Sequence, residues 1–185
     1  MNLLAWYEKG MSFPEYVNKM TVNGDELRSI HDAFRIPESL IPDLEPLKQK
    51  NLRVIVLAAD WCTDAMLCIP ILQKLCEGLG WQQRILIRDE NLALMDHYLT
   101  EGKSRAIPIF IFIDSEGNER SVWGTRSPEV ACVINDLRSQ LPEKESSNFK
   151  ELQQEMYGTY KKLLLTRHDL WDSTLSSMVS SLVNA

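Results

Sequence analysis

Cys62 is the residue of this sequence that is best placed to do chemistry. It follows an apolar run of strand character at residues 52–59 and precedes apolar residues at helical spacing that end near Gly78 or Gly80. We therefore expect Cys62 at the start of a helix, where unpaired backbone N–H groups and the helix dipole favour a thiolate. Because the thiolate is the reactive form of cysteine, this position predicts a lowered pKa and a nucleophilic sulfur.

The neighbours of Cys62 each have two alternative roles. Asp64, in the first turn of the helix, either interacts favourably with the helix dipole or relays a proton, although its charge would raise the pKa of the thiol. Thr63 or Asp60 would help to cap the helix. Trp61 either shields the core or offers a flat apolar surface to an extended substrate.

These residues resemble the active site of the thioredoxin family. Trp61 and Cys62 match the Trp-Cys pair that opens that site, and Pro70 falls eight residues later, where the family has a helix-kinking proline. Ile107 and Pro108 resemble the cis-proline segment, which lies against the reactive sulfur and borders the substrate groove. The motif Trp-Cys-x-Asp and the helical N-terminal region resemble, more narrowly, those of bacterial thioredoxin-like proteins that carry an N-terminal helical extension.

The sequence departs from the thioredoxin pattern in two places. Ala65 stands where the resemblance places the resolving cysteine, and Val56 stands where the family has a buried carboxylate that assists proton transfer. Whether Ala65 is natural or engineered, Cys62 lacks its usual partner. Cys68 would lie about 120° around and about 9 Å along the same helix, which excludes a disulfide with Cys62 unless the helix unwinds locally. The remaining thiols are interpreted as buried and inert: Cys68, Cys76 and Cys132.

The pattern along the chain predicts an α/β fold with a thioredoxin-like central mixed sheet and helices on both faces. Strands are expected at 52–59, 84–88, 109–114 and 119–123, with helices after Cys62, at 92–99 and at 127–141. This order gives a parallel pair of strands joined to an antiparallel pair. We expect a single domain over 1–185, divided into an N-terminal helical extension at 1–50, a thioredoxin core at 51–141 and C-terminal helices at 142–185.

Both extensions are predicted to be helical. The first contains a helix capped by Ser12 and Glu15, a second from Asn23 or Gly24, and a third at 42–50. After a linker-like stretch at 140–148, a polar helix at 149–165 precedes an amphipathic helix that contains Trp171. An amphipathic helix needs a partner, which is its own domain, a second copy of the chain in a homodimer, or Cys62 with the helix as a lid.

Composition and charge restrict the class of protein. The 185 residues are 44% hydrophobic and 25% charged, which suits one substantial core. Irregular cysteine spacing and the lack of a leader-like start favour the reducing cytoplasm over a secreted disulfide framework. The longest apolar stretch, 106–113, is too short for a bilayer, and a formal charge of −6 does not attract nucleic acid. The cysteine and histidine spacings indicate no metal site, and we expect no cofactor.

Three functions are consistent with these residues. The first is a thiol–disulfide oxidoreductase in which Cys62 forms a mixed disulfide that an outside thiol resolves, its partners being protein disulfides or small thiols such as glutathione. The second is a redox-inactive binding module that keeps the groove around Trp61 and Pro108. The third is a sensor in which oxidation of Cys62 changes the packing of the terminal helices.

Overall fold

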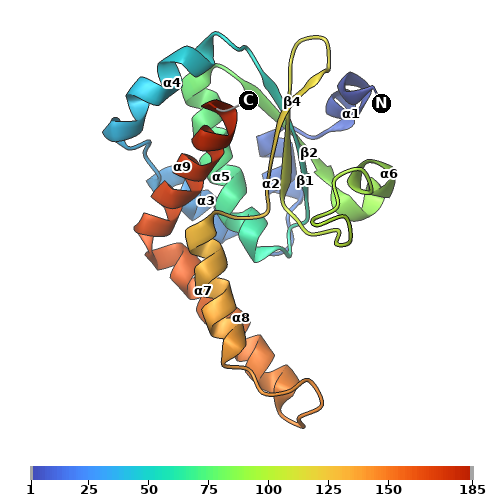
Figure 1. Cartoon of the computed structure of the whole chain (residues 1–185), viewed down its shortest axis with the longest axis vertical. Helices are drawn as coiled ribbons and strands as arrows, with labels where there is room; N and C mark the ends of the chain where they lie inside the picture. Colours follow the sequence, from blue (N-terminus) through green and yellow to red (C-terminus); the bar gives the residue numbers. More distant parts are fainter. Residues whose placement is uncertain (1, 184–185) are drawn as a thin grey trace.

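A four-stranded mixed sheet forms the centre of the molecule in the computed structural model, which describes residues 2–183 (Figure 1). The strands are β1 (Arg53–Ala58), β2 (Gln82–Ile87), β3 (Ile109–Ile113) and β4 (Glu119–Gly124). Their order is β2-β1-β3-β4, with β1 parallel to β2 and with β3 antiparallel to β1 and β4. This topology confirms the predicted α/β fold.

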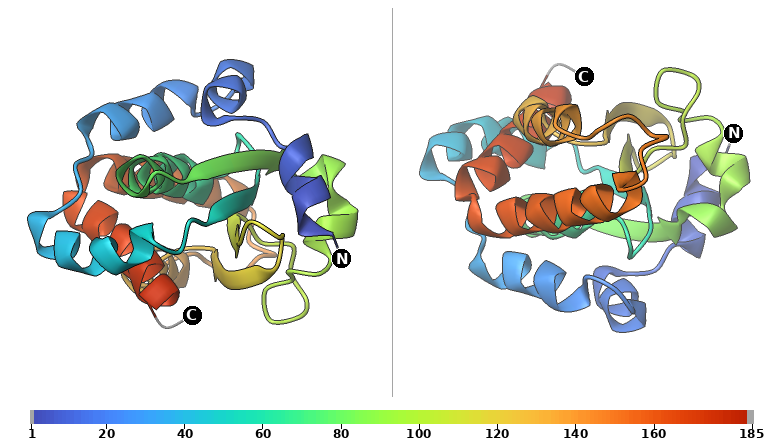
Figure 2. Two further views of the ribbon diagram at one scale, coloured as in Figure 1. Left: turned by 90° about the horizontal axis from the view of Figure 1, so that it is seen from above. Right: turned by 90° about the horizontal axis from the view of Figure 1, so that it is seen from below.

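Helices cover both faces of the sheet, as the strand sequences require. All five residues of β3 and the last five of β1 are buried, which explains their continuous apolar runs. Figures 1 and 2 show the helices that lie on the two sides. On one side are α5 (Thr63–Leu79), α7 (Pro128–Ser139) and α9 (His168–Val183), and on the other are α1 (Leu3–Lys9) and α6 (Leu92–Met95).

The three helices predicted in the N-terminal extension are confirmed, and a fourth, α1, precedes them. They are α2 (Phe13–Lys19), α3 (Gly24–Ala33) and α4 (Ile41–Lys48), with a 3-10 turn, η1 (Glu38–Leu40), before α4. The Glu15 carboxylate accepts hydrogen bonds from the backbone and hydroxyl of Ser12, each at 2.7 Å, which completes the predicted cap of α2. Met11 exchanges two backbone hydrogen bonds with Ile85, so this extension covers the outer edge of β2.

The C-terminal extension consists of α8 (Phe149–Thr166) and α9. The ribbons of α7 and α8 lie side by side and extend away from the sheet at the bottom of Figure 1. Helix α9 then returns to contact α4, α5, α7 and β4, and its Leu175 and Met178 are fully buried. The buried face of α9 therefore packs against its own chain, which is the first of the three partners considered for this helix, and the homodimer stays a prediction.

The segment after β2 is less regular than the sequence predicts. A 3-10 turn, η2 (Arg88–Glu90), precedes α6, which ends at Met95 rather than continuing to Leu99. The amides of His97 and Tyr98 bond three residues back, to Leu94 and Met95, which tightens the chain into turns. Within residues 2–183, no helix has both the length and the apolarity that crossing a bilayer requires.

Candidate functional site

Cys62 lies between β1 and α5, where it is the N-cap residue of the helix. Its side chain is 7% exposed, and its thiol donates a hydrogen bond to the Ile107 carbonyl oxygen at 3.4 Å. The peptide bond between Ile107 and Pro108 is cis, and this segment leads directly into β3. The fold thus brings together Cys62 and the Ile107–Pro108 segment, which are 45 residues apart.

The predicted lowering of the Cys62 pKa is wrong. Burial raises the pKa of the thiol to about 11, and the negative charge of Asp64 adds to the effect. The amides of Ala65 and Asp64 and the Arg126 charge act in the opposite direction. The influence of the helix start is therefore present but smaller than the cost of burying a thiolate, and the resting thiol is protonated at neutral pH.

Asp64 forms the centre of a buried polar cluster beside Cys62. Its carboxylate accepts a hydrogen bond from Arg126 Nη2 at 2.5 Å and another from the hydroxyl of Tyr160. A buried carboxylate is tolerated when such partners compensate its charge. Asp64 in turn raises the pKa of Arg126 despite burial, which opposes the charged form. The cluster links the start of α5 to the loop after β4 and to α8.

Arg126 and Tyr160 are site residues that the sequence pattern did not reveal. They lie 62 and 96 residues from Asp64 in the chain. Tyr160 carried a signal, because it belongs to a stripe of buried residues in α8 at helical spacing, with Met156 and Leu164. Arg126 follows β4 with no pattern around it that points to Asp64.

The residues on the N-terminal side of Cys62 have roles other than capping α5 or shielding the core. Trp61 is 52% exposed, and the Arg88 guanidinium lies 5.0 Å from the centre of its ring. The Asp60 carboxylate accepts hydrogen bonds at 2.9 Å from the amide and hydroxyl of Thr21, so it fixes the Cys62 loop to the N-terminal extension.

Cys62 borders a pocket with a volume of about 590 Å³, which we call the Cys62 pocket. The loop before α5, the segment before β3, α7 and α8 all contribute to its walls. Its lining includes Trp61, Cys62, Ile107, Arg126, Tyr157 and Tyr160. Helix α8, rather than α9, is therefore the C-terminal element that borders the cysteine.

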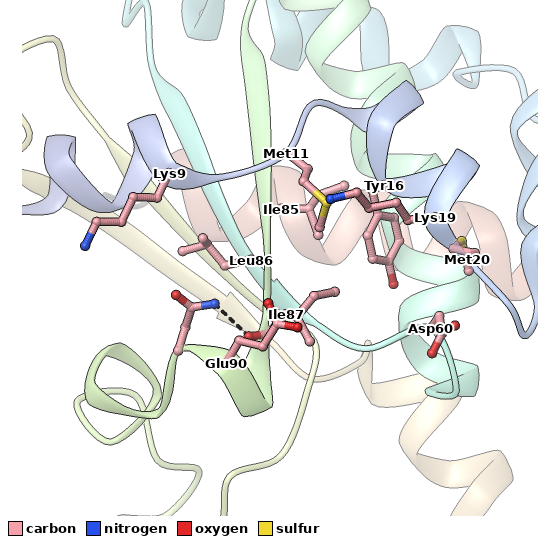
Figure 3. Close-up of a pocket in the computed structure, with 11 residues that line it drawn as sticks. Lys9, Met11, Tyr16, Lys19, Met20, Asp60, Ile85, Leu86, Ile87 and Glu90 are labelled. Atoms are coloured by element: carbon pink, nitrogen blue, oxygen red, sulfur yellow. Dashed lines mark hydrogen bonds between the residues drawn. The ribbon is translucent and has the colours of Figure 1, made fainter.

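A second pocket, of about 530 Å³, lies between the N-terminal extension and β2 (Figure 3). Its charged lining residues are balanced, with Lys9 and Lys19 against Asp60 and Glu90. The Tyr16 hydroxyl is buried and has no hydrogen-bond partner among the described residues. Burial raises the pKa of Tyr16, and the charges of Asp60 and Cys62 raise it further. This pocket contains no nucleophilic thiol.

None of the other cysteines forms a disulfide with Cys62. All four cysteines are free, and burial raises the pKa values of Cys68 and Cys76. Cys132 is exposed, contrary to the prediction, because α7 directs Val130 and Ile134 inward and Cys132 lies halfway between them in sequence, on the opposite side of the helix. Among the described residues, no group of three His, Cys, Asp or Glu could hold a metal ion.

Comparisons with known proteins bear on the family and the fold. A family model described as thioredoxin matches residues 10–138. No curated protein matches the sequence. A protein of unknown function from Pseudomonas aeruginosa has a similar structure, with a TM-score of 0.71 and 14% identity over 100% of this chain and 98% of that one. The crystal structure of an HIV epitope scaffold is also similar, with a TM-score of 0.67 and 13% sequence identity. That match covers 100% of this chain and 96% of the scaffold. At such low identity these two structures show a shared fold alone.

Proposed function

The chain belongs to the thioredoxin family, and we propose that it exchanges disulfides slowly through Cys62 alone. The observation that carries this proposal is the position of the sulfur, beside the Ile107 carbonyl and at the wall of a pocket. Ala65 supplies no second sulfur, so the resolving thiol must come from outside, either from a small thiol or from a protein.

The exchange has two steps. The Cys62 thiol loses its proton to solvent, and its sulfur attacks one sulfur of a substrate disulfide. The substrate S–S bond breaks, a bond forms between Cys62 and one half of the substrate, and the other half leaves as a thiolate that takes up a proton. An outside thiolate then attacks the substrate sulfur of the mixed disulfide, which releases the Cys62 thiolate for protonation and forms a new disulfide.

The raised pKa makes both steps slow. With a pKa of about 11, about one Cys62 in ten thousand is a thiolate at pH 7, which limits attack on a substrate. A thiol of high pKa is also a poor leaving group, so the mixed disulfide is resolved slowly. We therefore expect a long-lived mixed disulfide, a property that also suits the sensor function.

Mass spectrometry of the folded protein tests this proposal. The background is Cys132→Ser, because the exposed Cys132 would otherwise react. After incubation with bis(hydroxyethyl) disulfide, we expect one adduct, located at Cys62 and removable by dithiothreitol. It should form about one hundred times faster at pH 9 than at pH 7, because the thiolate fraction rises tenfold per pH unit below the pKa.

The control is the same background with Cys62→Ser, which should give no adduct. A folded protein that forms no adduct at any pH, while the urea-unfolded chain reacts, would contradict the proposal. That result would favour the second candidate, a redox-inactive binding module. The raised pKa and the 7% exposure of Cys62 are the observations that support this alternative.

A further inference from the structure

We propose that the Cys62 pocket binds a small molecule that carries two acidic groups. This inference rests on the proposed function, because it assigns the charge of the disulfide or thiol that reaches Cys62. It commits to a small anionic compound and not to a neutral peptide segment.

The charge of the pocket is opposite to that of the chain. Four arginines line it, and Asp64 is the only acidic residue among its lining residues. The chain as a whole has a formal charge of −6. A concave site with one sign of charge attracts ligands of the opposite sign. The arginines are contributed by η2, the loop before β3, the loop after β4, and α7: Arg88, Arg105, Arg126 and Arg138.

The arginines lie at different depths. Arg126 is half-buried and contacts Asp64, which is two residues after Cys62 in the chain. Arg105 and Arg138 are exposed. Arg88 is half-buried and is held by its contact with the Trp61 ring and by a hydrogen bond from its Nη1 to the Arg105 carbonyl oxygen. A ligand with one acidic group near Cys62 and another toward the exposed side would meet guanidinium groups at both positions.

The guanidinium groups keep hydrogen-bonding capacity for a ligand. Arg138 forms no ion pair with any residue that the structure describes. The Nε of Arg126 is buried and has no hydrogen-bond partner among those residues, an arrangement that an acceptor on a ligand would satisfy. Arg88 and Arg105 pair with Asp89 and Asp96, which are not lining residues of the pocket.

The size of the pocket suits a small molecule. A volume of about 590 Å³ lies within the range of small-molecule sites, which is roughly 300–1,000 Å³. Trp61, Ile134 and Tyr157 add apolar and aromatic surface for a carbon chain between the acidic groups. Planar guanidinium groups bind carboxylates and phosphates with paired hydrogen bonds, so either group would fit.

Three small disulfides of similar length and different charge test the inference. They are dithiodipropionate, which is doubly negative, bis(hydroxyethyl) disulfide, which is neutral, and cystamine, which is doubly positive. Rates of adduct formation at Cys62 in the Cys132→Ser background are divided by the rates for the urea-unfolded chain, which removes the intrinsic reactivity of each reagent. We expect the normalised rate for dithiodipropionate to exceed that for the neutral reagent about tenfold, with cystamine slowest.

Arg138→Glu should remove most of this preference. Lys162→Glu is the matched control, because Lys162 is exposed and does not line the pocket, and the substitution changes the net charge of the chain equally. The Lys162 variant should keep the preference. Equal normalised rates for the three reagents, with adducts formed by all, would overturn this inference and leave the proposed function in place.

A binding measurement separates the two proposals. Thiodipropionate carries the same two carboxylates but has no disulfide to exchange, and thiodiglycol is its neutral counterpart. Calorimetry should show that thiodipropionate binds the Cys62→Ser chain more tightly than thiodiglycol does, and that Arg138→Glu weakens this binding. Binding without any adduct would overturn the exchange proposal alone, whereas no preference in either assay would overturn the pocket assignment.

Discussion

The reactivity of Cys62 reflects a balance between burial, which favours the neutral thiol, and the α5 amides, which favour the thiolate. Asp64 moves this balance toward the neutral thiol, because its charge raises the pKa of Cys62. Replacing it with the neutral isostere in Asp64→Asn removes that charge and leaves the Arg126 charge, which lowers the thiol pKa. We expect the pKa of Cys62 to fall by about one unit and its alkylation at pH 7 to become about tenfold faster.

The pH dependence of alkylation by iodoacetamide in the Cys132→Ser background measures this shift. Asp136→Asn, an exposed change on α7, is the control and should leave the profile unchanged. A profile for Asp64→Asn that coincides with that of the parent, in a chain shown to be folded by circular dichroism, would mean that Asp64 does not influence the thiol.

Two buried tyrosines provide a matched comparison of hydrogen bonding. The Tyr160 hydroxyl donates to Asp64, whereas the Tyr16 hydroxyl has no partner among the described residues. Tyr160→Phe removes a bond to a buried charge and should lower the free energy of unfolding by about 1.5–3 kcal/mol. Tyr16→Phe removes a hydroxyl that has no hydrogen-bond partner among the described residues. This substitution should change the free energy of unfolding by less than about 0.5 kcal/mol, or increase it. Urea unfolding measures both, and equal losses would contradict the assigned contacts.

The sequence predicted those site residues whose positions are indicated by their immediate neighbours in the chain. Cys62 stands between a buried strand and a helix, and Pro108 stands directly before another buried strand, so neighbouring residues indicate their positions. The partners of Asp64 come from the loop after β4 and from α8, and no short pattern links such distant segments. The pKa of Cys62 was mispredicted for the same reason, because burial is produced by the whole fold and is not visible in the helix start.

The junction between β4 and the Pro108 segment depends on a glycine. A Cβ atom at Gly124 would lie 2.5 Å from the Pro108 carbonyl oxygen, which is backbone and must move to accommodate it. Gly124→Ala should therefore displace the segment that contacts Cys62 and lower the free energy of unfolding by about 1–3 kcal/mol, as overpacking does. We also expect a change in the rate of Cys62 alkylation, measured with iodoacetamide beside urea unfolding.

Gly158 provides the matched control within α8. No atom lies within 4 Å of a Cβ built there, so Gly158→Ala should stabilise the chain by about 0.5–1 kcal/mol through helix propensity. A loss of stability at Gly158 as large as that at Gly124 would show that close approach to Pro108 is not the cause.

Periodicity predicted the well-packed helices and strands better than the short or edge segments. β2 begins at Gln82, two residues before the expected 84, because backbone pairing with β1 and not apolar content determines its start. Helix α1 was not predicted. Only Leu3 and Tyr7 of its seven residues are buried, which is too few to show a helical hydrophobic period in the sequence. Helix α6 was overextended, because apolar residues at 98 and 99 continue the pattern after the backbone has turned.

The C-terminal helices are attached to the thioredoxin-like core by two kinds of contact. Tyr160 in α8 bonds to the buried Asp64, and α9 buries Leu175 and Met178 against helices on one side of the sheet. Amphipathicity showed that α9 needs a partner, but the choice between its own chain and a second copy depends on how α8 directs the chain back, which no periodic pattern contains. The contacts support the proposal that residues 2–183 unfold as one unit.

Leu175→Ala tests this cooperativity. Leu175 is fully buried, so its truncation should lower the free energy of unfolding by about 2–5 kcal/mol. If the extension and the sheet form one unit, tryptophan fluorescence and far-ultraviolet circular dichroism will shift to the same lower urea midpoint. Val183→Ala, on the same helix but 54% exposed, should shift neither. Two separated transitions, with helical signal lost before the rest, would instead show that α8 and α9 unfold independently, because the core would then retain its stability without their packing.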